Sequence, residues 1–421
     1  MKFPHCIAAV VSLFLSFAAH SETLVLKAER WLDVSSGKIF SPASLVVNDG
    51  KITAVDPVTL PTNAKVIELG DMTLLPGLMD LHTHVAFEDV DGWQYEPATK
   101  NTAFYAMRSV RNAKKTLMAG FTTIREVGSP GFVDVELGKA TDLGWVDGPR
   151  VIPSGHAIGI TGGHCDVTGF KAGALEVDYR SGVADGVDEL IKAVRYQVKN
   201  GARSIKICVT SGVLSSGPNA GILQLNKTEL RAIIDEAHRQ KVKVTGHAHG
   251  KEGIIAASNA GIDSIEHASM MDAETIKILK ENGTFIVPTI FQWFLEYDYP
   301  PEQDAKNEYV KGFIENSMKL AIKKKLNIAF GTDSGVYPHG RNAEEFAVLV
   351  KFGMKPIDAI RTATTKAAEL MGITNRGRIE KELLADIIGV PGNPLEDIRV
   401  MENVSFVMKA GKVYKNLKPL E

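Results

Sequence analysis

Residues 226–247 read NKTELRAIIDEAHRQKVKVTGH, and this stretch predicts a helix followed by a buried strand. Asn226 is a typical N-cap residue, and Glu229 stands three positions later, as in a capping box. Apolar residues then recur at helical spacing, at Leu230, Ile233, Ile234 and Ala237. The β-branched run that follows ends just before His247, so this unit places a histidine at the carboxyl end of a strand.

The same helix-to-strand unit recurs along the chain. A glycine closes a helical pattern and a short strand-like run follows at Gly120, Gly201, Gly261 and Gly283. Repeated β and α units over residues 76–380 predict an α/β fold of the (β/α)8 TIM-barrel type, which takes about 250 residues. An open doubly wound sheet is the alternative, but no Gly-x-Gly-x-x-Gly follows an early strand to favour it.

The two ends of the chain read as short β-strands. Residues 44–47 and 51–55 flank the turn Asn48-Asp49-Gly50, which is a hairpin signal, and residues 404–408 and 412–414 repeat the pattern. Residues 385–390 are also strand-like. We therefore expect residues 22–75 and 381–421 to build one small β-sandwich domain beside the barrel.

The first residues predict export. Lys2 precedes a 14-residue apolar stretch, and small residues follow at Ala19 and Ser21, so residues 1–21 read as a signal peptide. The stretch is shorter than the roughly 20 residues of a membrane span, so we expect a periplasmic or secreted protein without a stable membrane anchor. Export leaves Cys165 and Cys208, which allow at most one disulfide.

Charge excludes one class of partner. The 421 residues carry 48 Lys and Arg against 50 Asp and Glu, a net charge of −2 without long runs of one sign. This balance shows no electrostatic footprint for nucleic acid. A small-molecule or dipeptide substrate fits this charge balance better than a nucleic acid does. The protein could also form a homo-oligomer, which the sequence does not decide.

Polar residues follow the predicted barrel strands, where an active site would lie. His82 and His84 have the i, i+2 spacing that puts both rings on one face of a strand. Lys206 stands inside an apolar strand, where desolvation penalises an ammonium ion. The predicted strand ends are near His82, Arg125, His156, Lys206, His247, His267, Pro288 and Asp333.

With these motifs the chain resembles the amidohydrolase superfamily, in particular its imidazolonepropionase-like branch of prolidase-like and arginine-carboxypeptidase-like metallopeptidases. The resemblance spans nearly the whole mature chain. It includes the segments 76–84 (PGLMDLHTH), 119–123 (AGFTT), 161–164 (TGGH), Lys206, 247–250 (HAHG), 265–268 (IEHA), 331–334 (GTDS) and 353–356 (GMKP).

The resemblance implies a binuclear metal centre. His82 and His84 would bind the first divalent ion, His247 and His267 the second, and a carboxylated Lys206 would bridge them. Asp333 would complete the first site. Nitrogen and oxygen ligands with a hydrolytic water suit zinc, although Mn²⁺ or Co²⁺ could take the same set.

The resemblance also implies the catalytic roles. Two cations would activate water and polarise a scissile carbonyl. Asp333 would accept the water proton and deliver it to the departing amine. His164, in the glycine-rich loop after the third strand, would stabilise the oxyanion.

Substrate-binding candidates are less defined. His249 shares the strand face of His247, so spacing alone does not choose between them, and only the resemblance assigns His247 to the metal and His249 to substrate. Gln224 stands where some prolidase-like enzymes have tyrosine, which argues against a proline preference. In the loop after Asp333, we expect pocket residues at Tyr337, His339 and Arg341.

The sequence differs from the family pattern at three further points. Glu126 replaces the usual Asp after Arg125, and Ser211 replaces the first residue of a common Gly-Gly pair. Cys208 shares the strand face of Lys206, and we expect a buried thiol there.

The predicted function is metal-dependent hydrolysis of amide bonds in dipeptides or N-acyl amino acids, as in a carboxypeptidase or dipeptidase. If Arg341 faces the pocket, its charge would favour a neutral or apolar C-terminal residue. The alternatives are an Xaa-Arg/Lys carboxypeptidase, an Xaa-Pro dipeptidase and a cyclic-amide hydrolase. A non-catalytic binding protein would be expected to lack some of the six metal-ligand residues, and all six are present.

Overall fold

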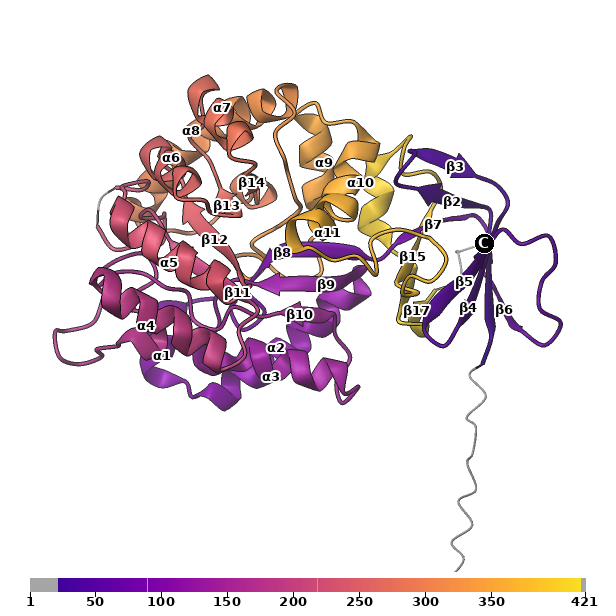
Figure 1. The fold of residues 1–421 in the computed structure, drawn as a ribbon, viewed down its shortest axis with the longest axis horizontal. Helices are drawn as coiled ribbons and strands as arrows, with labels where there is room; N and C mark the ends of the chain where they lie inside the picture. Colours follow the sequence, from indigo (N-terminus) through magenta and orange to yellow (C-terminus); the bar gives the residue numbers. More distant parts are fainter. Residues whose placement is uncertain (1–21, 89, 218, 418–421) are drawn as a thin grey trace, which may run out of the picture.

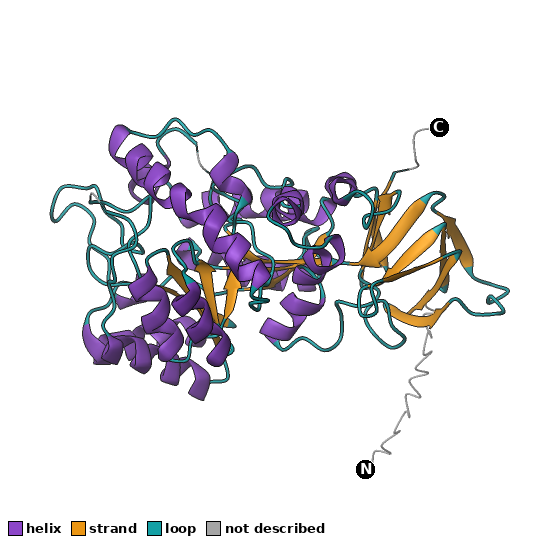
Figure 2. Ribbon diagram, turned by 90° about the horizontal axis from the view of Figure 1, so that it is seen from above, coloured by secondary structure: helices purple, strands orange, loops and turns teal. Residues whose placement is uncertain are grey.

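A computed structural model describes residues 22–88, 90–217 and 219–417. The proposed signal peptide lies outside these ranges. Two sheets stand at one end of the molecule, and a larger body of helices around central strands forms the rest (Figures 1 and 2). None of the helices in the described ranges combines the length and the apolar character that a membrane span requires.

Both chain ends contribute to the two sheets. The four-stranded sheet has the order β5-β4-β1-β6 and the six-stranded sheet the order β17-β16-β15-β7-β2-β3. Their bounds are β1 (Leu24–Ala28), β2 (Arg30–Asp33), β3 (Lys38–Phe40), β4 (Ala43–Asn48), β5 (Lys51–Val55), β6 (Lys65–Glu68), β7 (Met72–Pro76), β15 (Ile387–Pro391), β16 (Phe406–Lys409) and β17 (Lys412–Asn416).

The two sheets share one apolar core, which makes them a sandwich. Leu26 and Leu45 from the four-stranded sheet cluster with Leu74, Ile387 and Phe406 from the six-stranded sheet, and all five are fully buried. Both predicted hairpins are present, as β4 with β5 and β16 with β17.

Parallel strands form the barrel. They are β8 (Leu78–Thr83), β9 (Phe121–Glu126), β10 (Arg150–Ile152), β11 (Ser204–Cys208), β12 (Lys243–Ala248), β13 (Ser264–His267) and β14 (Phe285–Val287). They pair as β10-β9-β8 and as β11-β12-β13-β14. Beyond the end of β10, Ile158 forms an isolated parallel bridge with Ile207 of β11, which connects the chain after β10 to the second sheet.

An eighth segment closes the barrel. Residues 328–334 form parallel bridges at one end from Ile328 to Ile286 and at the other from Ser334 to Thr83. The backbone N–H of Leu81 also donates to the carbonyl of Phe330. The predicted TIM-like barrel with a β-sandwich is therefore confirmed, although the eighth segment is held by isolated bridges instead of a regular strand.

Helices surround these strands (Figure 1). They are α1 (Glu96–Thr99), α2 (Thr102–Met118), α3 (Val133–Asp142), α4 (Gly186–Lys199), α5 (Lys227–Arg239), α6 (Lys251–Asn259), α7 (Ala273–Glu281), α8 (Pro301–Lys323), α9 (Glu344–Lys351), α10 (Pro356–Thr362) and α11 (Thr365–Met371). Short 3₁₀ turns cover Trp93–Tyr95, Pro130–Phe132, Tyr179–Ser181, Phe291–Phe294 and Ile398–Asn403.

Local signals predicted several of these boundaries. The Asn226 side chain accepts hydrogen bonds from the backbone N–H groups of Thr228 and Glu229, and Glu229 accepts from that of Asn226, which completes the capping box of α5. The four predicted glycine caps all have positive φ angles, from 69° to 107°, and a strand begins one to three residues after each.

One strand end differs from the prediction. The third strand, β10, ends at Ile152 and not near His156. Pro153 follows directly, and proline has no N–H with which to continue a sheet ladder.

Candidate metal centre

The end of β8 and the eighth segment bring two histidines and one carboxylate together. Nε2 of His82 and Nε2 of His84 each lie 3.3 Å from Oδ1 of Asp333. Ligand atoms of all three residues fall within 4.8 Å of one another, and Asp333 is 8% exposed. This group has the size and the donor types of a metal site.

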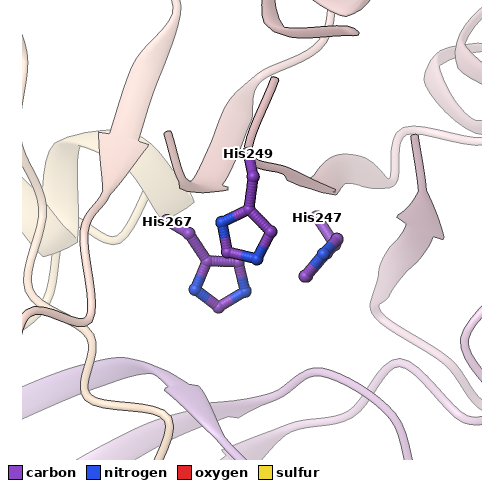
Figure 3. Close-up of side chains that lie close together, drawn as sticks. All are labelled: His247, His249 and His267. Carbon is purple, nitrogen blue, oxygen red and sulfur yellow. The ribbon is translucent and has the colours of Figure 1, made fainter. Parts of the chain in front are cut away.

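A second group comes from β12 and β13. His247, His249 and His267 are buried, and their ligand atoms also lie within 4.8 Å of one another (Figure 3). The ring of His267 lies 5.0 Å from that of His82, so the two groups adjoin. The structure thus brings together the five histidine and aspartate residues predicted as metal ligands, and it adds His249, which the sequence prediction assigned to substrate.

Lys206 lies beside both groups. It is buried in the middle of β11, and burial lowers the pKa of its ammonium group to about 8. Within the described part of the chain, the ammonium group of Lys206 forms neither an ion pair nor a hydrogen bond; the charges that act on it are those of Glu266, Asp333 and Arg125. A buried ammonium ion without a direct partner is costly, which is the problem that carboxylation would remove.

The histidine rings are oriented to offer Nε2 toward the cluster. Their Nδ1 atoms contact groups behind the site: Glu266 behind His82 at 2.6 Å, Ser269 behind His249 at 2.9 Å, and Thr289 behind His267 at 2.7 Å. Such outer contacts fix the tautomer of metal-binding histidines.

Protonation also suits metal binding. Burial and the neighbouring imidazoles hold the pKa values of His247 and His267 well below their usual range, and burial lowers that of His249 to about 3. Nε2 of His247 is buried without a hydrogen-bond partner among the described residues. A divalent cation would satisfy this orphaned atom, so the residues present fit the metal centre that the sequence predicts.

Sequence reasoning missed the carboxylate that supports His82. Glu266 accepts hydrogen bonds from Arg125, at 2.8 Å, and from the hydroxyl groups of Thr245 and Ser264. Burial alone would raise its pKa, but Arg125 and His82 hold the pKa of Glu266 at about 2. A charged pair inside apolar strands is the signal that could have revealed this contact.

A second missed residue is Gln292, in the turn after β14. Its amide donates to Oδ2 of Asp333 at 3.0 Å and to Oγ1 of Thr289 at 3.1 Å.

Two of the candidate ligands, His267 and Asp333, have left-handed backbones, with φ of 68° and 64°. Such strain in non-glycine residues tends to cluster at functional sites.

His164 lies next to the second histidine group. Its ring centroid is 4.0 Å from that of His247, and its Nδ1 lies 2.7 Å from Oγ of Ser215. Its backbone N–H donates to Oε1 of Gln224 at 3.1 Å. Burial lowers the pKa of His164 to about 3, so the ring is neutral at ordinary pH.

The three predicted pocket residues after Asp333 take different positions. Tyr337 is buried against Phe291, with ring centroids 5.3 Å apart. His339 lies behind His84, with Nε2 3.2 Å from the His84 carbonyl oxygen. Neither contact is made with a side chain of the candidate metal ligands.

Arg341 is not a free charge. Its guanidinium forms two hydrogen bonds with Glu344, at 2.6 and 2.9 Å, and lies 5.1 Å from the ring of Phe291. Because Glu344 neutralises Arg341, the predicted repulsion of basic substrates by Arg341 loses its physical basis.

The expectation of a buried thiol at Cys208 is wrong. Cys165 and Cys208 form a disulfide, with a Cα–Cα distance of 5.9 Å. The bond joins the residue after His164 to the end of the strand that carries Lys206. The sequence allowed this pair but did not place the two residues side by side.

Comparisons with known proteins agree with this geometry. A model described as the amidohydrolase family matches residues 73–414. Ochratoxinase from Aspergillus niger is 34% identical over 372 residues, which cover 81% of this chain and 75% of the relative. Imidazolonepropionase from Aeromonas salmonicida (strain A449) is 23% identical over 402 residues, which cover 86% and 91%.

A solved structure shows the same fold. It is that of a Xaa-Pro dipeptidase with methionine bound in its active site, and the similarity has a TM-score of 0.89 and a sequence identity of 37%. It covers 94% of this chain and 100% of the other.

Proposed function

The chain belongs to the amidohydrolase family, whose members named above include enzymes that act on amide bonds, and we propose that it is a binuclear metal-dependent hydrolase of dipeptides or N-acyl amino acids. The observation that carries this proposal is the pair of adjoining donor groups, His82-His84-Asp333 and His247-His249-His267.

The first ion would be held by His82, His84 and Asp333, and the second by His247 and His267 with His249 within reach. Divalent ions there would supply a Lewis acid for the scissile carbonyl and would acidify water. Histidine nitrogens together with a carboxylate suit zinc. We propose that Lys206 forms the bridge between the two ions.

Lys206 would serve as a carbamate. The ammonium group would first lose one proton to water. The neutral amine nitrogen would then form a bond to the carbon of CO₂ and lose a second proton to water, so that an anionic oxygen ligand replaces the buried cation. The lack of a direct counter-ion for Lys206 among the described residues supports this assignment.

Proton transfer would fall to Asp333. Oδ1 faces the two histidine Nε2 atoms, and Gln292 holds Oδ2 by a hydrogen bond, so the carboxylate has a defined orientation. Asp333 would accept a proton from the attacking water and pass it to the amine nitrogen as the C–N bond breaks. An amide nitrogen leaves poorly unless it is protonated.

His164 would bind the carbonyl oxygen of the substrate. As a neutral ring beside His247, it offers an N–H donor in a partly buried setting, where a hydrogen bond to developing negative charge is stronger than in water. Gln224 and the Cys165–Cys208 disulfide hold the loop that carries it.

We propose an apolar or neutral C-terminal residue as the preferred leaving group. The similar dipeptidase structure contains methionine in its active site, an apolar amino acid. In this chain, Trp293 packs edge-on against His249, with ring centroids 5.8 Å apart, which gives that side of the cluster an aromatic neighbour.

A substrate panel tests the proposal. Zinc-loaded protein is assayed on Leu-, Phe-, Pro-, Arg- and Lys-terminated dipeptides, on N-acyl amino acids and on cyclic amides. We expect the highest kcat/KM for linear substrates with apolar ends. Faster cleavage of Arg- or Lys-terminated substrates, or of cyclic amides, would reject this preference while leaving the metal chemistry in place.

We further propose that the protein is exported to the periplasm or beyond. The disulfide between the His164 loop and the end of β11 supports this assignment, because disulfides persist in oxidising compartments. Fractionation of cells that express the full chain, followed by N-terminal sequencing of the mature protein, tests it.

A further inference from the structure

The loop after β11 places a hydroxyl group against His164. Oγ of Ser215 lies 2.7 Å from Nδ1 of His164, and Ser215 is 7% exposed. No described residue forms a hydrogen bond with Nε2, the other ring nitrogen of His164. Ser215 therefore sets the hydrogen-bonding state of one side of the ring, and the other side is left for a ligand.

The direction of this hydrogen bond follows from what else Ser215 contacts. A serine hydroxyl has one hydrogen to donate and two lone pairs. The backbone N–H of Gly212 donates to Oγ at 2.8 Å and so uses one lone pair. If Nδ1 of His164 were the donor to the second lone pair, the Ser215 hydrogen would have no acceptor among the described residues, so we infer that the hydroxyl donates to Nδ1.

A neutral imidazole carries a single N–H hydrogen. If Nδ1 accepts from Ser215, that hydrogen is on Nε2. We propose that Ser215 is a positioning residue that holds His164 in the Nε2–H tautomer, so that His164 presents a hydrogen-bond donor to the scissile carbonyl oxygen. This inference rests on the proposed function, because the donor is useful only if an amide carbonyl binds beside His247.

Lys306, on helix α8, holds the loop that carries Ser215. Nζ of Lys306, on α8, donates to the carbonyl oxygens of Ser215 and Gly217 at 2.6 and 2.9 Å. Lys306 is itself 3% exposed, so this contact is buried. The ammonium group pins the loop to the outer helix and limits the movement of the Ser215 hydroxyl.

Gly212 permits the close approach of the two rings. A Cβ atom at this position would lie 2.6 Å from Cε1 of His164 and 2.8 Å from Nε2 of His247. Ser211, which replaces a glycine of the family pattern, closes the same loop through Oγ: it donates to the carbonyl of Asn219 and accepts from the N–H of Ile222. The loop is thus built to bring Ser215 and His164 together.

Nitrogen NMR of histidine tests the tautomer without using activity. Full-length protein labelled with ¹⁵N-histidine is measured with and without zinc, and the His164 signals are assigned by their loss in His164→Asn. We expect Nδ1 of His164 to give the signal of an unprotonated ring nitrogen and Nε2 that of a protonated one. A protonated Nδ1 in the wild-type protein would overturn the proposal.

Kinetics test the consequence. Ser215→Ala should lower kcat about 10-fold and change KM less than about 2-fold, because the donor strengthens its contact as negative charge develops on the oxygen. Ser215→Thr, which keeps the hydroxyl, should recover most of kcat, and the metal content should stay the same in both variants.

Ser216→Ala is the matched control. Ser216 neighbours Ser215 in the loop after β11, and its hydroxyl donates to Oγ1 of Thr168 at 2.7 Å. Among the described residues, Ser216 forms no hydrogen bond with His164. If Ser216→Ala lowers kcat as much as Ser215→Ala does, Ser215 only stabilises the loop and the proposal fails. Absence of amide hydrolysis in wild-type protein would reject the proposed function, whereas the NMR result would still decide the tautomer.

Discussion

Oε2 of Glu266 lies 2.6 Å from Nδ1 of His82, and both side chains are almost fully buried. The same carboxylate accepts a hydrogen bond from Arg125. This contact fixes the His82 ring so that Nε2 faces Asp333. Carboxylate-to-histidine contacts of this kind orient metal ligands and increase their basicity.

Glu266→Gln should weaken metal binding. Glutamine can still contact Nδ1 of His82 but removes the charge that pairs with Arg125, and loss of such an outer partner costs about 10- to 100-fold in metal affinity. Competition with a zinc chelator measures the change. Glu236→Gln, which removes a buried carboxylate on α5, is the control and should retain wild-type affinity. Equal affinity in the Glu266 variant and wild type would contradict this role.

Lys206→Ala should lose most bound metal and activity, because the bridge is shared by both ions. Elemental analysis gives the metal content, with close to two ions expected in the wild type. Added short carboxylic acids should restore part of the metal content and part of the activity, since they supply anionic oxygens in place of those of the carbamate. Lys409→Ala removes another buried lysine, in the sandwich, and should keep the metal. A Lys206→Ala protein with full metal and turnover would exclude the bridge.

Asp333→Asn should keep the fold but lose activity. General acid–base catalysis is worth typically about 10²–10⁴-fold in rate, and asparagine cannot accept the water proton. The comparison requires equal metal content in both proteins, so kcat is measured after metal loading and checked against elemental analysis. Near-normal turnover in the loaded variant would show that the proton acceptor is another group.

Replacement of both Cys165 and Cys208 by serine should lower stability. The disulfide spans a sequence separation of 43 residues, and cross-links of this kind contribute about 2–4 kcal/mol. Because the bond joins the His164 loop to β11, we also expect a lower kcat. Thermal unfolding with and without a reductant measures the first effect. An unchanged Tm in the variant and in reduced wild type would contradict it.

The sequence alone predicted the barrel, because the signals for its units are local. The capping box at Asn226 and the glycine caps before the strands depend on neighbours within a few residues, and the alternation of helix and strand then restricts the topology. Position at the ends of predicted strands marked the polar residues to examine. The assignment of particular residues as metal ligands came from the family resemblance, because spacing alone did not choose between His247 and His249.

The tertiary structure decided what depends on distant partners. Glu266 and His82 are 184 residues apart in sequence, and Ser215 and His164 are 51 apart, so no periodicity connects them. The sequence suggested an unpaired cation at Arg341, whereas in the structure Arg341 forms an ion pair with Glu344. Cys165 meets Cys208 only because strand packing brings the two segments together. Sequence periodicity reports which face a side chain occupies, but only packing determines which group it meets there.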